Sequence, residues 1–513
     1  MALLCGPIAA GSASGDPLPP MPMPKPVQTP VPAATDFHKE ELQLSLQDCL
    51  ERAFKSNLDL AIQRISPLEA RANIVTAQGA YDPVLSLSGG YNQEQSVENI
   101  GSYFYYTGTR NTSGSASIDQ PLPSGTTIGI TASTGASEGT GSDLPEQWDS
   151  FTGLTLSQSL LQNFGTDVGE ATIRIARRDA AGADASLEYE VDQVITNVAT
   201  AYYELVYARA DYEAGIESLG LAQQLLKDNQ ERVRIGVMSP LDVSQANSEV
   251  AARREDLLTA ERTIQDDENA MRLLISKDVA PLLKVRLVPL DLPPDNWTPD
   301  PLKSDINTAL LNRADLQQAR ELLAHNQLAE AYRKNQLLPS LGLTGAYGYN
   351  GVSDGLPGSA ARTLNAENPA WSIGLALSIP LGDRSQEGQY ETAQYETERQ
   401  KLILHQLEQN VIIQTDNAGG QAETNRQKIV AARVARQLAE ESLHDEEEKL
   451  RAGASTSYTV LQLQRDLHDA RIVELRAIAD FQESSAQLDQ SEGLARSKHH
   501  IEIEGEALNL PTP

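Results

Sequence analysis

The hydrophobic positions change their period several times along the chain. Between residues 167 and 235 the chain has almost no Gly or Pro, and apolar residues recur in alternating steps of four and three. Such steps form a heptad seam, which predicts a long helix packed against a neighbour. The first seam contains Leu187, Val191, Val194, Val198, Ala201, Leu205 and Ala208, and a second contains Ile195, Ala199, Tyr202 and Val206. We therefore expect a helix of about 65–70 residues, on the order of 100 Å long, with neighbours on two sides.

A short stretch, RVRIGVMSPLDVSQAN, interrupts this helical run, and a similar stretch, KLRAGASTSYTVLQLQ, interrupts another run about two hundred residues later. Each has a Gly that can adopt the left-handed conformation ending a helix, and a Ser or Thr three residues later that can cap the next helix. Pro after the first cap suits the first helical position. The expected reversals are built by Gly236, Ser239, Pro240 and Asp242 (residues 236–242), and by Gly453, Thr456 and Thr459 (residues 453–459).

From Tyr81 the pattern becomes alternating, which predicts strands. Leu85, Leu87 and Tyr91 fall on one face, and the chain up to Phe164 is rich in Gly, Ser and Thr and poor in Lys and Arg. A hairpin is expected around Pro121–Gly125. Strands with an apolar face and a small polar face are typical of membrane β-barrels, which must close because an open edge cannot face lipid.

The second half of the chain repeats the order of the first. The segment AFKSNLDLAIQRIS from Ala53 matches ALLNRADLQQAREL from Ala309, and GLTLSQSL matches GLALSIPL. At constant spacing Asp59 meets Asp315, Leu60 meets Leu316, Pro83 meets Pro339, Leu85 meets Leu341, Leu87 meets Leu343, Gly89 meets Gly345 and Tyr91 meets Tyr347. The sequence thus predicts a tandem duplication, with helix, strands, long helix, turn and long helix occurring twice.

The duplication divides the chain into five segments. We expect a Pro-rich linker at 1–39, a first repeat at 40–276 with strands over about 82–165, and a crossover at 277–308. A second repeat at 309–496, with strands over about 339–382, and a tail at 497–513 complete the chain. Each half has few strands, so several chains together would close a barrel.

Charge and composition exclude some classes of partner and site. The net charge is −30, so nucleic-acid binding, which needs a basic face, is not expected. No run of eighteen apolar residues occurs, which excludes a helical membrane span. With two cysteines and scattered histidines, we expect no enzyme activity, no cofactor and no metal site.

The two cysteines are interpreted differently. Cys49 lies on a predicted amphipathic helix and is expected in the core. The N-terminus has an apolar patch without a basic region, like the end of a clipped signal peptide, and Cys5 within it is a candidate for lipidation. Leu4 before it is larger than the small residue that usually precedes a lipidated Cys.

Five motifs follow one another along the chain: LSLQDCLERAFKSNLDL, YDPVLSLSGGY, GLTLSQSLLQNFG, LPSLGLTGAY and IGLALSIPLGD. Together with the two turns, they resemble the TolC family of outer-membrane efflux channels. The resemblance covers about residues 40–496. It implies a homotrimer: a β-barrel in outer-membrane lipid, continuous with a long periplasmic α-helical barrel and a mixed equatorial belt. It also implies passive export, with an inner-membrane pump and a periplasmic adaptor that docks at the two turns.

Two departures from the family pattern leave questions open. The family commonly has two strands per half, whereas residues 100–150 are extra here; they either add strands or form a periplasmic or extracellular elaboration. Within them, Tyr103–Tyr106 is either an aromatic girdle or a surface loop. Some relatives carry aspartates after the second turn, where this chain has Thr459 and Gln462. Gln462 and Asp466 are the candidates for lining the tunnel mouth, and an acidic ring there is not expected.

Four further alternatives remain at this stage. The charge run Asp445–Lys449 is either a solvated helix face or tunes the pore entrance, and His499–His500 is either a solvated tail or a metal-binding pair. The same fold also serves polypeptide secretion in one step. A protein of another class, a periplasmic coiled-coil structural protein without a pore, explains the helices but not the repeated alternating strands.

Overall fold

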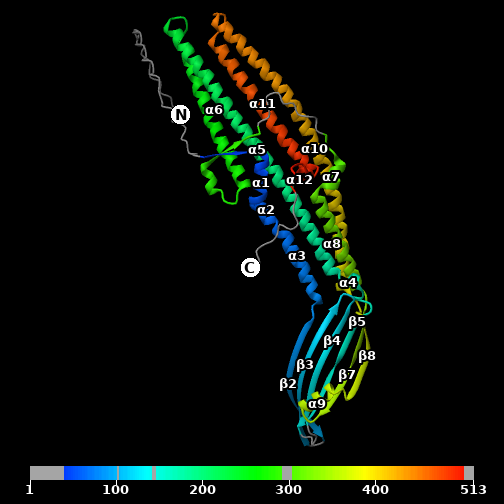
Figure 1. Ribbon diagram of the computed structural model, residues 1–513. Helices are drawn as coiled ribbons and strands as arrows, with labels where there is room; N and C mark the ends of the chain where they lie inside the picture. The colour runs from blue at the N-terminus through cyan, green and yellow to red at the C-terminus, as the bar shows by residue number, and fades with distance from the viewer. Residues whose placement is uncertain (1–39, 101–102, 141–145, 292–302, 502–513) are drawn as a thin grey trace, which may run out of the picture.

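The computed structural model describes residues 40–100, 103–140, 146–291 and 303–501. The molecule is elongated, with a β-sheet at one end and long helices that run away from it (Figure 1). Two helical hairpins form the end farthest from the sheet: α5 (Ala171–Arg234) with α6 (Pro240–Ile275), and α10 (Arg384–Arg451) with α11 (Ser457–Ser491). This arrangement matches the predicted tandem duplication of strands and long helices.

The sheet is an antiparallel meander of six strands in the order β2-β3-β4-β5-β7-β8. Four strands come from the first repeat and two from the second. The extra sequence around residues 100–150 therefore adds strands, and Tyr103–Tyr106 begin one of them. The strands are β2 (Val84–Ile100), β3 (Tyr103–Leu122), β4 (Thr126–Thr140), β5 (Gln147–Ser159), β7 (Ser340–Ser353) and β8 (Asn368–Ser378).

The register gives the sheet one apolar face and one polar face. One row across all six strands carries large apolar side chains, and every one of them is exposed: Leu85, Ile118, Ile130, Leu154, Tyr347 and Trp371. The adjacent row, on the other face, carries only small residues: Ser86, Ser117, Thr131, Gly153, Gly348 and Ala370. An exposed apolar row on one face and small, mostly polar residues on the other form the pattern of a barrel wall between lipid and water.

A short helix that the sequence analysis did not predict, α9 (Leu356–Leu364), packs against the sheet between β7 and β8. Ser359 is fully buried, and its Oγ lies 2.8 Å from Oγ of Ser150 on β5. The Oγ1 of Thr152 donates to Oγ1 of Thr363 at 3.3 Å. The small side chains of α9 thus sit on the same face as the apolar row.

The long helices pack through the predicted seams. Both seams of α5 are buried except for half-buried Ala201. α5 packs against α6, α8 and α11, which gives it neighbours on more than one side. The helices of this part are α3 (Ile65–Gln78), α4 (Thr166–Gly169), α5 (Ala171–Arg234), α6 (Pro240–Ile275), α8 (Ala314–Gln336), α10 (Arg384–Arg451) and α11 (Ser457–Ser491). Over the stretches that the model describes, each helix is either too short or too polar to cross a membrane.

A mixed region surrounds the middle of the helices. Its core contains Leu44, Leu50 and Tyr202, and Cys49 is buried as predicted. Burial raises the pKa of the Cys49 thiol to about 12, which keeps it unreactive. The crossover contributes a strand, β6 (Val285–Pro289), parallel to β1 (Glu40–Leu44). The remaining elements here are α1 (Leu46–Ser56), α2 (Leu58–Gln63), η2 (Ala280–Lys284), α7 (Ile306–Asn312) and α12 (Ala495–Lys498), and η1 (Gly79–Tyr81) joins α3 to β2 at the sheet.

Candidate functional site

The first tip, residues 232–242, ends α5 with a left-handed glycine. Gly236 has a φ of 78°. Its N–H donates to the carbonyl of Val233 at 3.0 Å, and the N–H of Val237 donates to the carbonyl of Arg232 at 3.0 Å. This pair of bonds is the Schellman motif, which satisfies carbonyls left free at the end of a helix.

The same tip starts α6 with a capping box. The N–H of Ser239 donates to Oδ2 of Asp242 at 3.1 Å, and the N–H of Leu241 donates to Oγ of Ser239 at 3.2 Å. Pro240 occupies the first helical position, where no N–H is needed. Asp242 is half-buried and already inside the helix, so its carboxylate acts first as a cap.

The second tip, residues 449–459, repeats the helix ending. Gly453 has a φ of 77°. Its N–H donates to the carbonyl of Leu450 at 3.2 Å, and the N–H of Ala454 donates to the carbonyl of Lys449 at 2.8 Å. The two tips therefore use one backbone motif, as their shared Gly predicts.

The second tip starts its next helix differently. The N–H of Thr459 donates to Oγ1 of Thr456 at 3.3 Å, and the two hydroxyls lie 2.9 Å apart. No carboxylate takes part, so this cap is neutral where the first is anionic. Gln462 and Asp466 follow on α11 with exposed side chains.

The first tip also exposes apolar side chains that the sequence analysis did not single out. Ile235, Val237 and Leu241 are 59 %, 69 % and 63 % exposed. At the second tip, Ala454 is small and exposed, and Tyr458 is the large apolar group that reaches solvent. The sequence contained a signal for this exposed apolar surface, namely apolar residues on both sides of a turn glycine. It was informative because a solvated turn favours polar residues.

The two tips are joined by hydrogen bonds between residues far apart in sequence. Nδ2 of Asn229 donates to Oγ of Ser457 at 2.6 Å, and both side chains are buried. Nη1 of Arg232 donates to the carbonyl of Leu450 at 3.4 Å. Beneath these bonds lies an apolar cluster drawn from α5, α10 and α11: Leu225, Leu443, Leu450, Val460, Leu461 and Leu467. The hairpins thus meet as one packed unit.

Ion pairs continue this connection along the helices. Glu249 on α6 is 3 % exposed and accepts from Nε of Arg253 and Nε of Arg465, at 2.9 and 2.8 Å. Burial opposes the charge of Glu249, but the hydrogen bond from Arg465 and the charge of Arg253 outweigh it and hold the pKa below its ordinary value. Arg476 on α11 likewise pairs with Glu204 on α5.

The charge run at Asp445–Lys449 forms pairs along its own helix. Glu446 lies 3.0 Å from Lys449, and Glu447 lies 3.4 Å from Arg451. The hydroxyl of Ser455, and then Lys449, lower the pKa of Glu446. These contacts connect the charge run to the second tip. The ion pairs of the run lie within its own helix, as on a solvated helix face.

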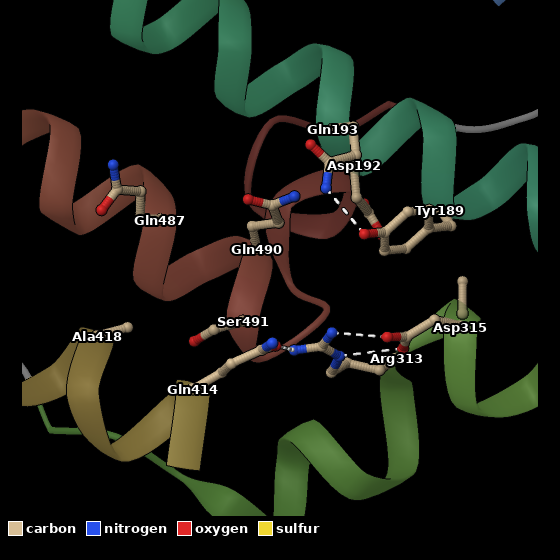
Figure 2. Close-up of a pocket in the computed structure, with 11 residues that line it drawn as sticks. Tyr189, Asp192, Gln193, Arg313, Asp315, Gln414, Ala418, Gln487, Gln490 and Ser491 are labelled. Atoms are coloured by element: carbon tan, nitrogen blue, oxygen red, sulfur yellow. Dashed lines mark hydrogen bonds and ion pairs between the residues drawn. The ribbon is translucent and has the colours of Figure 1, made fainter. Parts of the chain in front are cut away.

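A polar cavity of about 280 Å³ lies where the two repeats meet (Figure 2). Arg313 donates to Asp315 at 2.6 and 3.0 Å and to Oε1 of Gln414 at 3.0 Å. Nε2 of Gln193 donates to the hydroxyl of Tyr189 at 3.0 Å. These five lining groups therefore pair with one another, and the pairs contain no nucleophile with its base.

Within residues 40–100, 103–140, 146–291 and 303–501, no three His, Cys, Asp or Glu side chains are grouped to hold a metal ion. His499 is half-buried after α12, and burial lowers its pKa. Cys5, the candidate for lipidation, lies outside the described residues.

Comparison with known proteins gives consistent results. Residues 126–276 and 306–494 match the family described as "Outer membrane efflux protein". The probable efflux pump outer membrane protein TtgC of Pseudomonas putida is 24% identical over 282 residues, covering 54% of this chain and 56% of that protein. The chain thus spans about half the length of the curated relatives it matches.

Two solved structures share the fold. The CmeC outer membrane channel of Campylobacter jejuni has a TM-score of 0.64 at 17% identity, covering 88% of this chain and 86% of that one. The outer membrane protein VceC of Vibrio cholerae has a TM-score of 0.64 at 18% identity, covering 87% and 96%. The family match covers more than half of the chain and extends into both repeats, and the chain therefore belongs to the outer membrane efflux protein family.

Proposed function

We propose that this chain is the outer-membrane channel subunit of a three-part export system, and that it closes as a homotrimer. In this role it passively conducts small molecules, such as drugs, metals or other solutes, from the periplasm to the outside, and it catalyses no reaction. The observation that carries the proposal is the amphipathic sheet: its exposed apolar row would face lipid and its small polar row would face a water-filled lumen.

The free edges of the sheet support closure by several chains. β2 and β8 each pair on one side only within the described residues, and an open edge in lipid is costly because its N–H and C=O groups find no partner. β2 and β8 end the same antiparallel meander, so β2 of one copy can pair with β8 of the next. Such a head-to-tail contact closes into a ring.

The tips are the proposed docking sites for the periplasmic adaptor, which would link the channel to an inner-membrane pump. The exposed apolar residues Ile235, Val237 and Leu241 suit contact with a partner hairpin. Gly236 and Gly453 have no atoms near the position of an added Cβ, which leaves room for a close approach. Gln462 and Asp466, exposed on α11, are the proposed tunnel-mouth residues.

Export in a deletion strain tests this proposal. A strain without its own outer-membrane channel would receive this chain together with its neighbouring pump genes. We expect restored export of drugs or metals, with protein export measured in parallel to separate small-solute efflux from polypeptide secretion. Folded chain in the outer membrane with no restored export of any cargo would contradict the proposal.

A further inference from the structure

The hairpin formed by β3 and β4 is inserted in the middle of the sheet, between β2 and β5. β2, β5, β7 and β8 each connect to a helix of the long-helix region, directly or through a short turn. β3 and β4 connect only to strands. The sheet thus has six strands, but only four of them connect to the long helices.

The hairpin has the alternation of a barrel wall. Ile118 on β3 and Ile130 on β4 pair with each other on the apolar face, and Ser117 and Thr131 pair on the polar face. Ile130 continues the apolar row to Leu154 on β5. A hairpin that folded away from the wall would have no reason to match both faces of its neighbours.

The turn of the hairpin is fixed to the junction between sheet and helices. Gly125 has a φ of 79°, and its carbonyl accepts from the N–H of Ser159 at 2.9 Å. The N–H of Gly165 donates to the carbonyl of Ser124 at 3.1 Å. A Cβ at Gly169 would collide with the carbonyl of Pro123, so the end of α4, just before α5, packs closely against this turn.

An inserted pair of strands also leaves the direction of every other strand unchanged. β2 and β5 run antiparallel with β3 and β4 between them, and they would still do so if the pair were removed. The free edges β2 and β8 therefore keep the directions that ring closure requires.

We propose that this hairpin widens the outer barrel, so that three copies close an eighteen-stranded wall instead of a twelve-stranded one. This inference rests on the proposed trimeric channel. With strands about 4.8 Å apart and tilted by about 40°, eighteen strands enclose a backbone cylinder about 36 Å wide, against about 24 Å for twelve. Barrels of this strand number leave an aqueous channel.

The consequence concerns the cargo that can leave. The inner row is built of Ser, Thr, Gly and Ala, whose small side chains leave most of the width open. The exit then passes bulky hydrated cargo, and selection by size takes place at the tip end of the molecule. The hairpin is thus a device that sets exit width without altering the helices.

The direct test is electron microscopy of the full chain in nanodiscs, with a matched variant that lacks residues 103–140. We expect trimers whose barrel shows eighteen strands in the full chain and twelve in the variant, which narrows the wall by about one third. A twelve-stranded barrel in the full chain, with the hairpin outside the wall, would overturn the inference. Absence of any trimer would instead reject the proposed function.

A pair of substitutions keeps the test decisive if the deletion does not fold. Ile130→Arg places a charge on the apolar face of β4, and Thr131→Arg places it on the polar face. We expect Ile130→Arg to lower the yield of heat-resistant trimers at least tenfold and Thr131→Arg to leave it within twofold. Equal yields from the two variants would show that β4 is not in the wall.

Discussion

The two repeats differ most in the sheet and least at the tips. The first repeat contributes four strands, and the second contributes two strands and the helix α9. Both repeats end their long helices with the same Schellman motif, at Gly236 and Gly453. A barrel tolerates an added pair of strands because the directions of the neighbouring strands are preserved. A helix reversal tolerates less sequence change, because its backbone hydrogen bonds depend on a few residues in fixed conformations.

The largest effect is expected from the feature that the tips share. Gly236→Val or Gly453→Val forces a β-branched residue into the left-handed region, at a cost of about 1–2 kcal/mol. Neither site has a neighbour within the chain to clash with, so within the chain the substitution acts through backbone strain. We expect export to fall about tenfold, measured as cargo accumulation in cells, while the trimer yield is unchanged.

Gly236→Asn is the matched control, since Asn tolerates the left-handed conformation better than other residues. It should retain more export than Gly236→Val. Wild-type export by both valine variants would contradict the assignment of these turns to the docking end.

The hydrogen bond that joins the two tips gives the next effect, which is on stability and hydrogen exchange instead of export. Asn229→Leu removes the donor to Ser457 and leaves that buried hydroxyl without this partner, which costs about 1–3 kcal/mol. We expect a lower thermal midpoint and faster hydrogen exchange at both tips. Asn247→Leu, at an exposed position on α6, is the control and should change neither.

A half-buried carboxyl on α11, that of Glu483, predicts a dependence on pH. Burial, and then the charge of Glu204, raise the pKa of Glu483 to about 7 from an ordinary value near 4.5. The folded state therefore binds a proton more tightly than the unfolded chain, so stability is lost as the pH rises from about 4.5 to about 7. Glu483→Gln should flatten this part of the profile of thermal midpoint against pH. An unchanged profile would rule out Glu483 as its source.

The smallest expected effect on stability distinguishes the N-cap of α6 from the N-cap of α11. Asp242→Ala removes the acceptor of the capping box and should destabilise the first tip by about 1 kcal/mol. Thr459→Ala removes a hydroxyl but keeps the backbone bond to Thr456, so its cost should be smaller. Hydrogen exchange at the start of α6 and of α11 measures both.

Sequence patterns predicted the features that depend on local chemistry. The seams of α5 follow from residue spacing, and the helix endings follow from Gly236 and Gly453. The role of residues 100–150 stayed open, because strands rich in Gly, Ser and Thr carry little hydrophobic contrast. The bond between Asn229 and Ser457 was not predicted, because it joins residues 228 positions apart. Such contacts exist only after the hairpins pack.

The most direct measurement of the central claim combines oligomeric state with conductance. The full chain would be purified in detergent, examined for urea-resistant trimers and added to planar bilayers. The account predicts trimers that conduct ions in discrete steps. A monomer that stays soluble without detergent and produces no conductance would contradict it.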